Sequence, residues 1–376
     1  MTKLIDITGK ALAGEWGNDD ETGTGIPVLR TTNFTNEGVV NYESVVTRSI
    51  TKKNIEDKFL RPGDIIIEKS GGSDKQPVGR VIFYEGPENT FLFNNFTGVL
   101  RVKDTSKWFP RFVFYSLYSN YSKGGTRAYE NKTTGLHNLK TDDYVSRFEV
   151  TDANYSEQIK ICDLLDKTTN VIRTRQQQLS ALENLIKARF VEMFGDPLLN
   201  PKNWQEKKLE EIADIVSGIT KGRKVQSADL YEVPYMAVSN VKDGYIDWTT
   251  VKTILATQAE IEQYRLLPND VLMTEGGDPD KLGRGAIIHE PPSDCIHQNH
   301  IFRVRLDQSR INPEFMEQYL QHQKAKLYFL GCAKQTTGIA SVNMKQLRAL
   351  PMLIPPIGLQ REFAAIVAQI DKSKYD

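Results

Sequence analysis

An internal repeat constrains this 376-residue chain most, because its two halves carry the same sequence blocks in the same order. The block IPVLRTTNF is matched by VPYMAVSNV, LRPGDIIIEKSGG by LLPNDVLMTEGG, and PVGRVIFYEGP by KLGRGAIIHEP. Three more pairs follow, namely TGVLRVKD with HIFRVRLD, KTTGLHNLK with QTTGIASVNMK, and EQIKICDLLDK with QREFAAIVAQIDK. The offset of about 205 residues is too long for a solenoid, so the sequence predicts a tandem duplication of a domain plus a helix.

Composition narrows the class of protein further. The 48 basic residues balance 48 acidic ones, which argues against a protein that coats nucleic acid non-specifically but permits a locally basic cleft. No apolar run approaches the length of a membrane helix, and the start MTKLIDITGK lacks the apolar core of a secretory signal, so we expect a cytoplasmic protein. Cys162, Cys295 and Cys332 are too scattered for a disulfide framework or a CxxC metal pair.

Each half is expected to have an α+β fold with a curved, mostly antiparallel sheet. Short runs such as DIIIEK, RVIFYEG and HIFRVRL are β-branched or aromatic and bounded by Gly, Pro or Asp, which favours strands. RFVFYSLYSN and PEFMEQYLQHQKAKLYFL are predicted to be helical. The predicted domains are a first α+β domain (1–153), a spacer helix (154–197), a second α+β domain (198–356) and the start of a second spacer helix (357–376).

Residues 156–194 contain no Pro and no Gly and predict one helix about 58 Å long, with Ser156 as its N-cap and Gly195 as its stop. Apolar residues at seven-residue spacing favour one strand of a coiled coil over an amphipathic helix lying on its own domains. Leu165, Ile172, Leu179, Ile186 and Met193 have this spacing, and Leu182 fits the companion position of the predicted stripe.

The second copy of this helix is predicted to pack against the first. Phe363, Ile366 and Ile370 have helical spacing, but the given sequence ends at Asp376, so the second helix is less than half as long as the first. We therefore expect the uncovered half of the first helix to expose apolar side chains, unless another chain completes the coiled coil or a partner covers it.

With these blocks in this order, the chain resembles the specificity subunit of type I restriction–modification systems. LRTTNF, LRPGDIIIEKSGG, KTTGLHNL, NLIKARFVEMFGDPLLNPKNW and IPPIGLQREFAAIVAQID are similar to that family across essentially the whole chain. The resemblance implies two target-recognition domains that read a split double-stranded DNA site and antiparallel helices that act as a ruler. It also implies prokaryotic methyltransferase and restriction subunits as partners. S-adenosylmethionine, ATP and Mg²⁺ would be bound by those subunits, and no cofactor by this chain.

The Gly-rich stretch EKSGGSDKQPVGR and its repeat EGGDPDKLGR are not P-loops, because neither contains GK[ST] and Pro77 blocks a helix there. Each is either a turn between strands or a turn that faces DNA. The cations favour the second reading, since Lys and Arg contact phosphates and Arg can read guanine. The DNA-contact candidates here are Lys69, Gly71, Gly72, Lys75, Arg80, Lys281 and Arg284.

Polar clusters in irregular stretches supply further candidates, because Asn and Gln pair with adenine and Thr contacts bases or phosphates. The first half offers Arg127, Tyr129, Asn131, Lys132, Thr133 and Thr134. The second half offers Lys334, Gln335, Thr336 and Thr337, and the basic stretch SGITKGRK adds Lys221, Arg223 and Lys224. For any single one of these residues, a solvated loop side chain is the alternative.

No catalytic residue or metal ligand is predicted. EPPSD and IPPIG do not fit the N/D-P-P-Y/F motif of an adenine methyltransferase, and no GxGxxG opens a βαβ unit. His297 and His300 lack a third metal ligand at useful spacing. We therefore expect a non-catalytic recognition subunit. The alternatives are a nuclease or self-contained restriction enzyme, and a truncated scaffold or inhibitor that binds the methyltransferase without supporting methylation.

Overall fold

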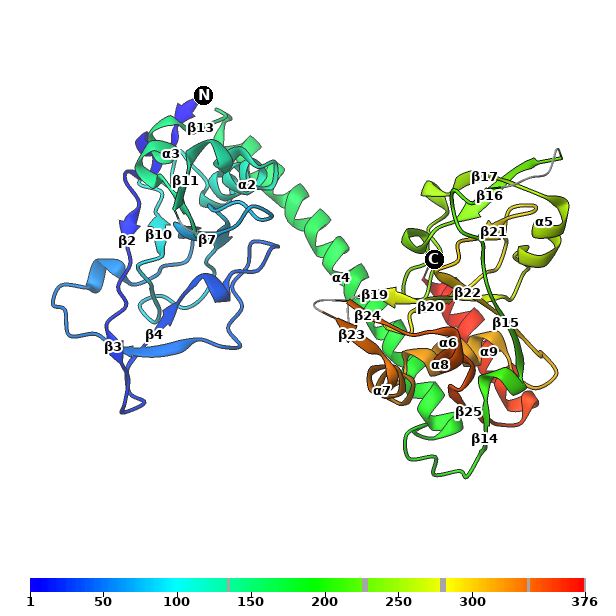
Figure 1. Ribbon diagram of the computed structural model, residues 1–376. Coiled ribbons are helices and arrows are strands. Elements are labelled where there is room, and N and C mark those ends of the chain that lie inside the picture. Colours follow the sequence, from blue (N-terminus) through cyan, green and yellow to red (C-terminus); the bar gives the residue numbers. More distant parts are fainter. Residues whose placement is uncertain (134–135, 225–228, 278–281, 337–338, 375–376) are drawn as a thin grey trace. The chain divides into compact units, whose positions relative to one another are not determined.

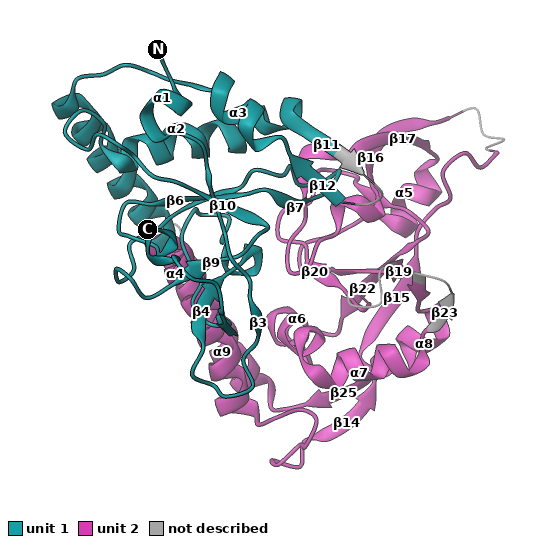
Figure 2. Cartoon of the chain, turned by 90° about the vertical axis from the view of Figure 1, so that its left-hand side faces the viewer, with its two compact units in different colours: residues 1–173 teal, residues 174–376 magenta. Residues whose placement is uncertain are grey.

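The computed structural model describes residues 1–133, 136–224, 229–277, 282–336 and 339–374 (Figure 1). The chain divides into two compact units, Met1–Arg173 and Thr174–Asp376 (Figure 2). Both units combine helices with small, mostly antiparallel sheets, which confirms the predicted α+β class. The boundary lies inside the long helix α4 (Tyr155–Phe194), although a separate spacer segment was predicted there. None of the described helices has the length and apolar character needed to cross a membrane.

The described strands of the first unit form small sheets with the orders β1-β13, β2-β10-β6-β8, β3-β5-β4-β9 and β11-β12-β7. Its strands are β1 (Thr2–Lys3), β2 (Leu12–Ala13), β3 (Asn18–Asp19), β4 (Ile26–Leu29), β5 (Val46–Ser49), β6 (Ile65–Glu68), β7 (Ser70–Gly72), β8 (Val81–Phe83), β9 (Leu92–Phe93), β10 (Thr97–Leu100), β11 (Glu130–Thr133), β12 (Leu136–Leu139) and β13 (Glu149–Val150). Its helices are α1 (Leu4–Thr8), α2 (Pro110–Ser122) and α3 (Thr141–Arg147), with 3₁₀ turns η1 (Thr31–Asn33), η2 (Glu56–Lys58) and η3 (Gly125–Tyr129).

The second unit has the sheet orders β14-β25, β15-β22-β18-β20, β17-β16-β21 and β19-β24-β23. Its strands are β14 (Gln205–Lys208), β15 (Ala213–Ser217), β16 (Tyr231–Met236), β17 (Lys252–Ala256), β18 (Val271–Thr274), β19 (Gly276–Gly277), β20 (Gly285–Ile287), β21 (Ile296–His297), β22 (Ile301–Leu306), β23 (Lys334–Thr336), β24 (Ile339–Ser341) and β25 (Pro351–Ile354). Its helices are α5 (Gln258–Tyr264), α6 (Pro313–Gln321), α7 (Gln323–Cys332), α8 (Met344–Arg348) and α9 (Ile357–Ser373), with 3₁₀ turns η4 (Leu209–Glu211), η5 (Val238–Asn240) and η6 (Trp248–Thr250).

The two four-stranded central sheets have the same topology and nearly the same register. In the first, β6 pairs antiparallel with β8 and β10; in the second, β18 pairs in the same way with β20 and β22. This register places Arg101 beside Asp64 and Arg305 beside Asp270. Arg101 therefore corresponds to Arg305, whereas the sequence blocks aligned it with Val304, one residue earlier. The duplication seen in the sequence is therefore a duplication of sheet topology.

A buried glutamine fixes the start of the spacer helix in each unit. Gln158 of α4 accepts a hydrogen bond from the Phe109 amide and donates to two backbone carbonyls. Gln360 of α9 makes the equivalent contacts, accepting from the Asn312 amide and donating to the Arg310 and Pro355 carbonyls. Both glutamine side chains are buried and hydrogen-bonded. Gln158 therefore holds α4 against the loop before α2, and Gln360 holds α9 against the loop before α6.

Helix α4 begins one residue before Ser156, and its N-cap is Asn154, not Ser156 as predicted. Asn154 and Glu157 form a reciprocal capping box, with backbone-to-side-chain distances of 2.9 and 3.1 Å. Gly195, with a left-handed φ of 76°, follows the last turn as predicted. Figure 1 shows α4 as one uninterrupted helix.

Helix α9 runs antiparallel to the C-terminal half of α4. The Phe363 ring packs against the rings of Phe190 and Phe194, and near the other end of α9 the Lys374 carbonyl accepts a hydrogen bond from Arg175. Ile186 and Ile370 are buried in the same cluster, whereas Leu182, Met193 and Ile366 are partly buried. Phe190 and Phe194 lie off the predicted seven-residue stripe, because side chains of α6 pack on this face of α4 as well as those of α9.

The N-terminal half of α4 exposes apolar side chains, as expected for the part that the second helix does not reach. Leu165 is 37% exposed and Ile172 is 54% exposed, and Leu179 further along is half-buried. Further exposed apolar residues on this half are Ile161, Leu164 and Val171. The predicted stripe therefore packs over its C-terminal half and faces solvent over the rest.

The single helix predicted over PEFMEQYLQHQKAKLYFL is two helices, α6 and α7. The break falls at His322, whose backbone is extended and whose side chain caps the Lys324 amide. Since His has no strong helix-breaking character, the sequence pattern gave no sign of this turn.

Candidate nucleic-acid interface

In the first unit, two sequence blocks far apart in the chain meet in one three-stranded sheet. Strand β7 carries the Ser-Gly-Gly of the Gly-rich stretch, and β11 and β12 form the hairpin that contains the KTTG block. Gly72 lies opposite His137, and Ser70 lies opposite Asn138. The sheet therefore brings five of the candidates predicted for this half together, namely Gly71, Gly72, Asn131, Lys132 and Thr133.

Buried polar contacts hold the Gly-rich turn against this hairpin. The Glu130 carboxylate accepts a hydrogen bond from the Val78 amide at 3.0 Å and lies 3.0 Å from His137 Nδ1. A side chain at Gly72 would place its Cβ 2.5 Å from the Val78 nitrogen, so only Gly fits this close approach. The turn thus has a defined structural role as well as an exposed edge.

The exposed edge carries the cations. Lys75, Arg127 and Asn131 are exposed and Lys69 is half-buried. Arg127 donates to the Asp74 carbonyl at 3.3 Å, which ties it to the turn. Tyr129 is half-buried with its ring 5.2 Å from that of Tyr144, so it belongs partly to the core. Of the remaining candidates, Gly71 is exposed on β7, Lys132 and Thr133 are placed only by their backbone on β11, and Thr134 lies outside the described residues.

Arg80 points into the first unit and away from this edge. Its guanidinium donates to the Thr31 and Phe34 carbonyls at 3.0 and 3.1 Å and to the Glu68 carboxylate at 3.3 Å. It also lies 5.5 Å from the centre of the Phe34 ring, and its side chain is only 15% exposed. This geometry gives Arg80 a structural role rather than the base-reading one that the sequence suggested.

The second unit repeats the arrangement with different side chains. Gly276 and Gly277 of β19 pair with Ser341 and Ala340 of β24, which also pairs with β23. The candidates Lys334, Gln335 and Thr336 lie on β23 and are placed by their backbone alone, and Thr337 and Lys281 lie outside the described residues. Arg284 immediately precedes β20 and is half-buried. In place of Lys69 this unit has Glu275, which pairs with His300 at 2.5 Å.

In the basic stretch SGITKGRK, Arg223 lies beside α5 and β17. Arg223 makes two 2.6 Å hydrogen bonds to the Glu260 carboxylate, which lowers the pKa of Glu260 to about 2, and donates to the Leu255 carbonyl. Lys221 and Lys224 are exposed. Only these two cations of the stretch thus present their charge to solvent.

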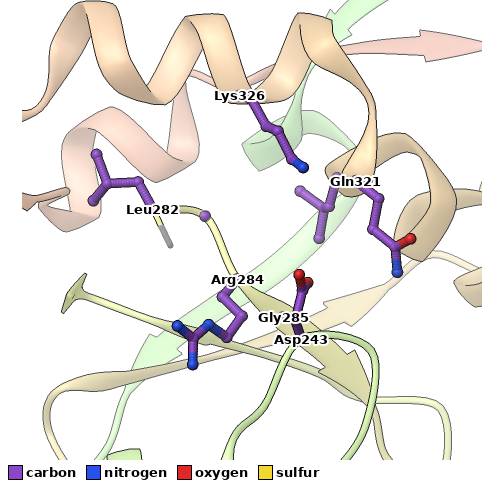
Figure 3. A pocket seen from close by; sticks show the side chains of 8 residues that line it. Asp243, Leu282, Arg284, Gly285, Gln321 and Lys326 are labelled. Carbon is purple, nitrogen blue, oxygen red and sulfur yellow. The ribbon is translucent and has the colours of Figure 1, made fainter. Parts of the chain in front are cut away.

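A hollow beside Arg284 contains residues that sequence reasoning did not single out. It has a volume of about 20 Å³ and is lined by Asp243, Gln321 and Lys326 as well as Arg284. Figure 3 shows the Arg284 guanidinium directed away from Gln321 and Lys326. Lys326 belongs to the stretch predicted as one helix, so its nearness to Arg284 depends on the break at His322.

A larger cavity of about 380 Å³ between α4, α6 and α9 has an acidic lining and does not suit DNA phosphates. Asp243, Glu317 and Asp371 line it, and burial raises the pKa of Glu317 to about 7. Glu183 adds a further carboxylate, against the two cations Lys187 and Lys374.

The two histidines considered as metal ligands, His297 and His300, have different surroundings. His297 is completely buried, with Nδ1 3.1 Å from the Ile301 carbonyl, and burial lowers its pKa to about 4. His300 is exposed and pairs with Glu275. Within the described parts of the chain, no cluster of three or more His, Cys, Asp or Glu side chains could hold a metal ion. All three cysteines are free thiols.

Comparisons with known proteins agree with this architecture. Residues 201–376 match the family model of the type I restriction modification DNA specificity domain. The putative type I restriction enzyme MjaX specificity subunit of Methanocaldococcus jannaschii is 27% identical over 173 residues, which are 46% of this chain and 40% of that protein. The EcoKI specificity subunit of Escherichia coli is 22% identical over 92% of this chain and 75% of its own length.

The fold is also that of a solved structure. The crystal structure of the type I restriction–modification S subunit from M. genitalium has a TM-score of 0.60 and 16% identity, and the match covers 99% of this chain and 89% of that one. The fold class is therefore the predicted one, in which two similar α+β units alternate with spacer helices. In sequence, the chain is similar to type I restriction–modification specificity subunits over most of its length, and residues 201–376 match the model of their DNA specificity domain.

Proposed function

We propose that this chain reads a bipartite double-stranded DNA sequence, one half with each unit. The observation that carries the proposal is the repeated sheet edge. In both units a Gly-containing strand pairs with a hairpin that carries Lys, Thr and Asn or Gln. Such side chains contact phosphates and base edges, and different residues on a common frame suit two different half-sites.

The proposed spacer is α4, whose 40 residues correspond to about 60 Å of helix. In recognition by paired modules, the separation of the modules sets the spacing of the half-sites. The length of α4 would therefore fix the gap between the two half-sites.

We further propose that the chain is not catalytic alone and docks methyltransferase subunits, with restriction subunits joining the complex. In this proposal S-adenosylmethionine, ATP and Mg²⁺ are bound by those partners. The exposed apolar half of α4, with Leu164 at 66% and Val171 at 69% exposure, suits contact with a partner.

The test is a base-resolution map of adenine methylation in cells that express the partner methyltransferase with and without this chain. A new motif made of two short half-sites with a fixed gap is the expected result. If no new methylation appears while the chain still co-purifies with the methyltransferase, the recognition role is contradicted and the scaffold alternative is supported. Methylation or cleavage by the purified chain alone would contradict its non-catalytic role.

A further inference from the structure

The two units place an arginine at the same position of the same sheet. In the first unit the Glu68 amide donates to the Arg80 carbonyl at 2.8 Å, one step beyond the β6–β8 ladder. In the second unit the Thr274 amide donates to the Arg284 carbonyl at 3.2 Å, one step beyond the β18–β20 ladder. Arg80 and Arg284 are therefore structural counterparts, and so are Glu68 and Thr274.

The first unit holds its arginine with three features. Glu68 is 3% exposed and supplies a carboxylate, Phe34 supplies a ring face, and the η1 turn supplies two carbonyls. Burial raises the pKa of Glu68, and the Arg80 charge opposes that shift, so the two groups depend on each other inside the unit. Arg80 has few donors left for a ligand.

The second unit has neither the carboxylate nor the aromatic ring that hold Arg80 in the first unit. Thr274 stands where the first unit has Glu68, and Val241 stands where it has Phe34. Arg284 makes no hydrogen bond or ion pair with any described residue, although Asp243 lines the same hollow. A half-buried guanidinium without a partner keeps its donors available for an acceptor brought by a ligand.

We propose that Arg284 is a specificity-determining residue that contacts a base in the half-site read by the second unit, whereas Arg80 contacts none. The inference rests on the proposed bipartite DNA reading. The identity of the side chain at position 68 or 274 decides which arginine is available: a carboxylate withdraws the guanidinium into the protein, and Thr leaves it for DNA. Arg preferentially donates two hydrogen bonds to guanine, so a guanine in that half-site is the expected contact.

The test uses the full chain in complex with its methyltransferase and the duplex motif found by the methylation map. Arg284→Ala should weaken binding to the cognate duplex by about ten-fold or more and relax the base preference at one position of one half-site. Thr274→Glu should have the same effect, because it places a carboxylate where the first unit has Glu68. Thr274→Gln is the matched control, since a neutral side chain of the same size should leave the preference intact.

Arg80→Gln supplies the second comparison, because it should leave the base preference of the other half-site unchanged. The inference is overturned if Arg284→Ala leaves the preference intact, if it weakens binding to all sequences equally, or if Thr274→Gln acts like Thr274→Glu. It is also overturned if Arg80→Gln relaxes the other half-site. Methylation by the complex with the unaltered chain distinguishes this inference from the proposed function. If the proposed function is wrong, the unaltered chain directs no methylation motif. If only this inference is wrong, the motif is present and the Arg284 variant does not change it.

Discussion

In the first unit Arg101 donates two 2.7 Å hydrogen bonds to Asp64, and in the second Arg305 donates two 2.8 Å hydrogen bonds to Asp270. The sheets around these pairs have the same strand order, and a buried glutamine anchors each following helix. The residues that directly follow the central strands differ, because Lys69 after β6 is replaced by Glu275 after β18. The difference teaches that buried polar pairs preserve the frame while the side chains beyond the strand ends vary.

The two units also differ at one buried position of their sheets. Phe93 of β9 and His297 of β21 occupy the same register position, and both are completely buried. The second unit therefore carries a titratable group where the first has an apolar ring. The two units should respond differently to acid even though their folds match.

The largest predicted effect tests whether the shared frame is equally important in both units. Asp64→Ala and Asp270→Ala each remove the carboxylate partner of a half-buried arginine and an acceptor for a backbone amide. We expect each to lower the stability of its own unit by about 3 kcal/mol, measured by native-state hydrogen exchange of β6 and β18. Asp57→Ala removes an exposed 3.8 Å pair and should cost less than about 0.5 kcal/mol. A large loss in only one unit would break the comparison.

A second prediction contrasts the two halves of α4. Phe190→Ala removes a buried ring that contacts Phe315 and Phe363, so we expect a loss of about 3–5 kcal/mol in the second unit. Ile172→Ala changes an exposed residue and should cost less than about 0.5 kcal/mol in the free chain. The stability losses of both variants are measured by urea denaturation, with hydrogen exchange of the α9 amides as the readout. Equal losses would show that the N-terminal half of α4 is covered in solution.

The third prediction concerns acid. The pKa of His297 is lowered to about 4 in the folded chain, against about 6.5 when unfolded, so the unfolded state binds more protons between these values. The second unit should lose stability as pH falls from 6.5 to 4, by up to about 3 kcal/mol, and His297→Phe should remove this slope. Stability measured at several pH values tests it, with the exposed His289→Gln as control. An unchanged slope in His297→Phe would sink the idea.

The smallest predicted effect concerns Glu260, whose pKa is lowered chiefly by its hydrogen bonds with Arg223. The stability that this pair contributes is present above the unfolded pKa of about 4.5 and is lost as pH falls toward 2. Glu260→Gln should cost about 1 kcal/mol at pH 7 and much less at pH 2. Hydrogen exchange at α5 and β17 measures the change. A cost that persists at pH 2 would mean that the side chain acts through packing.

Much of the frame could be predicted from the sequence, because apolar periodicity and turn residues are local signals. The duplication, the α+β class and the helix end at Gly195 follow from them, whereas the predicted N-cap Ser156 lies two residues beyond the actual cap, Asn154. The break at His322 did not follow, since an extended backbone at a histidine is stabilised by contacts distant in sequence. The seven-residue stripe was right only in part, because α6 and α9 together determine which face of α4 is buried.

The sequence by itself determined that two copies of one domain alternate with helices, and which residue types each copy carries at its turns. The tertiary structure decided which of those side chains are available. It joined the Gly-rich strand to the KTTG hairpin, enclosed Arg80 with Glu68 and Phe34, and left Arg284 without a partner among the described residues. The physical reason is that the availability of a cation depends on acceptors contributed by distant strands, which no local pattern encodes.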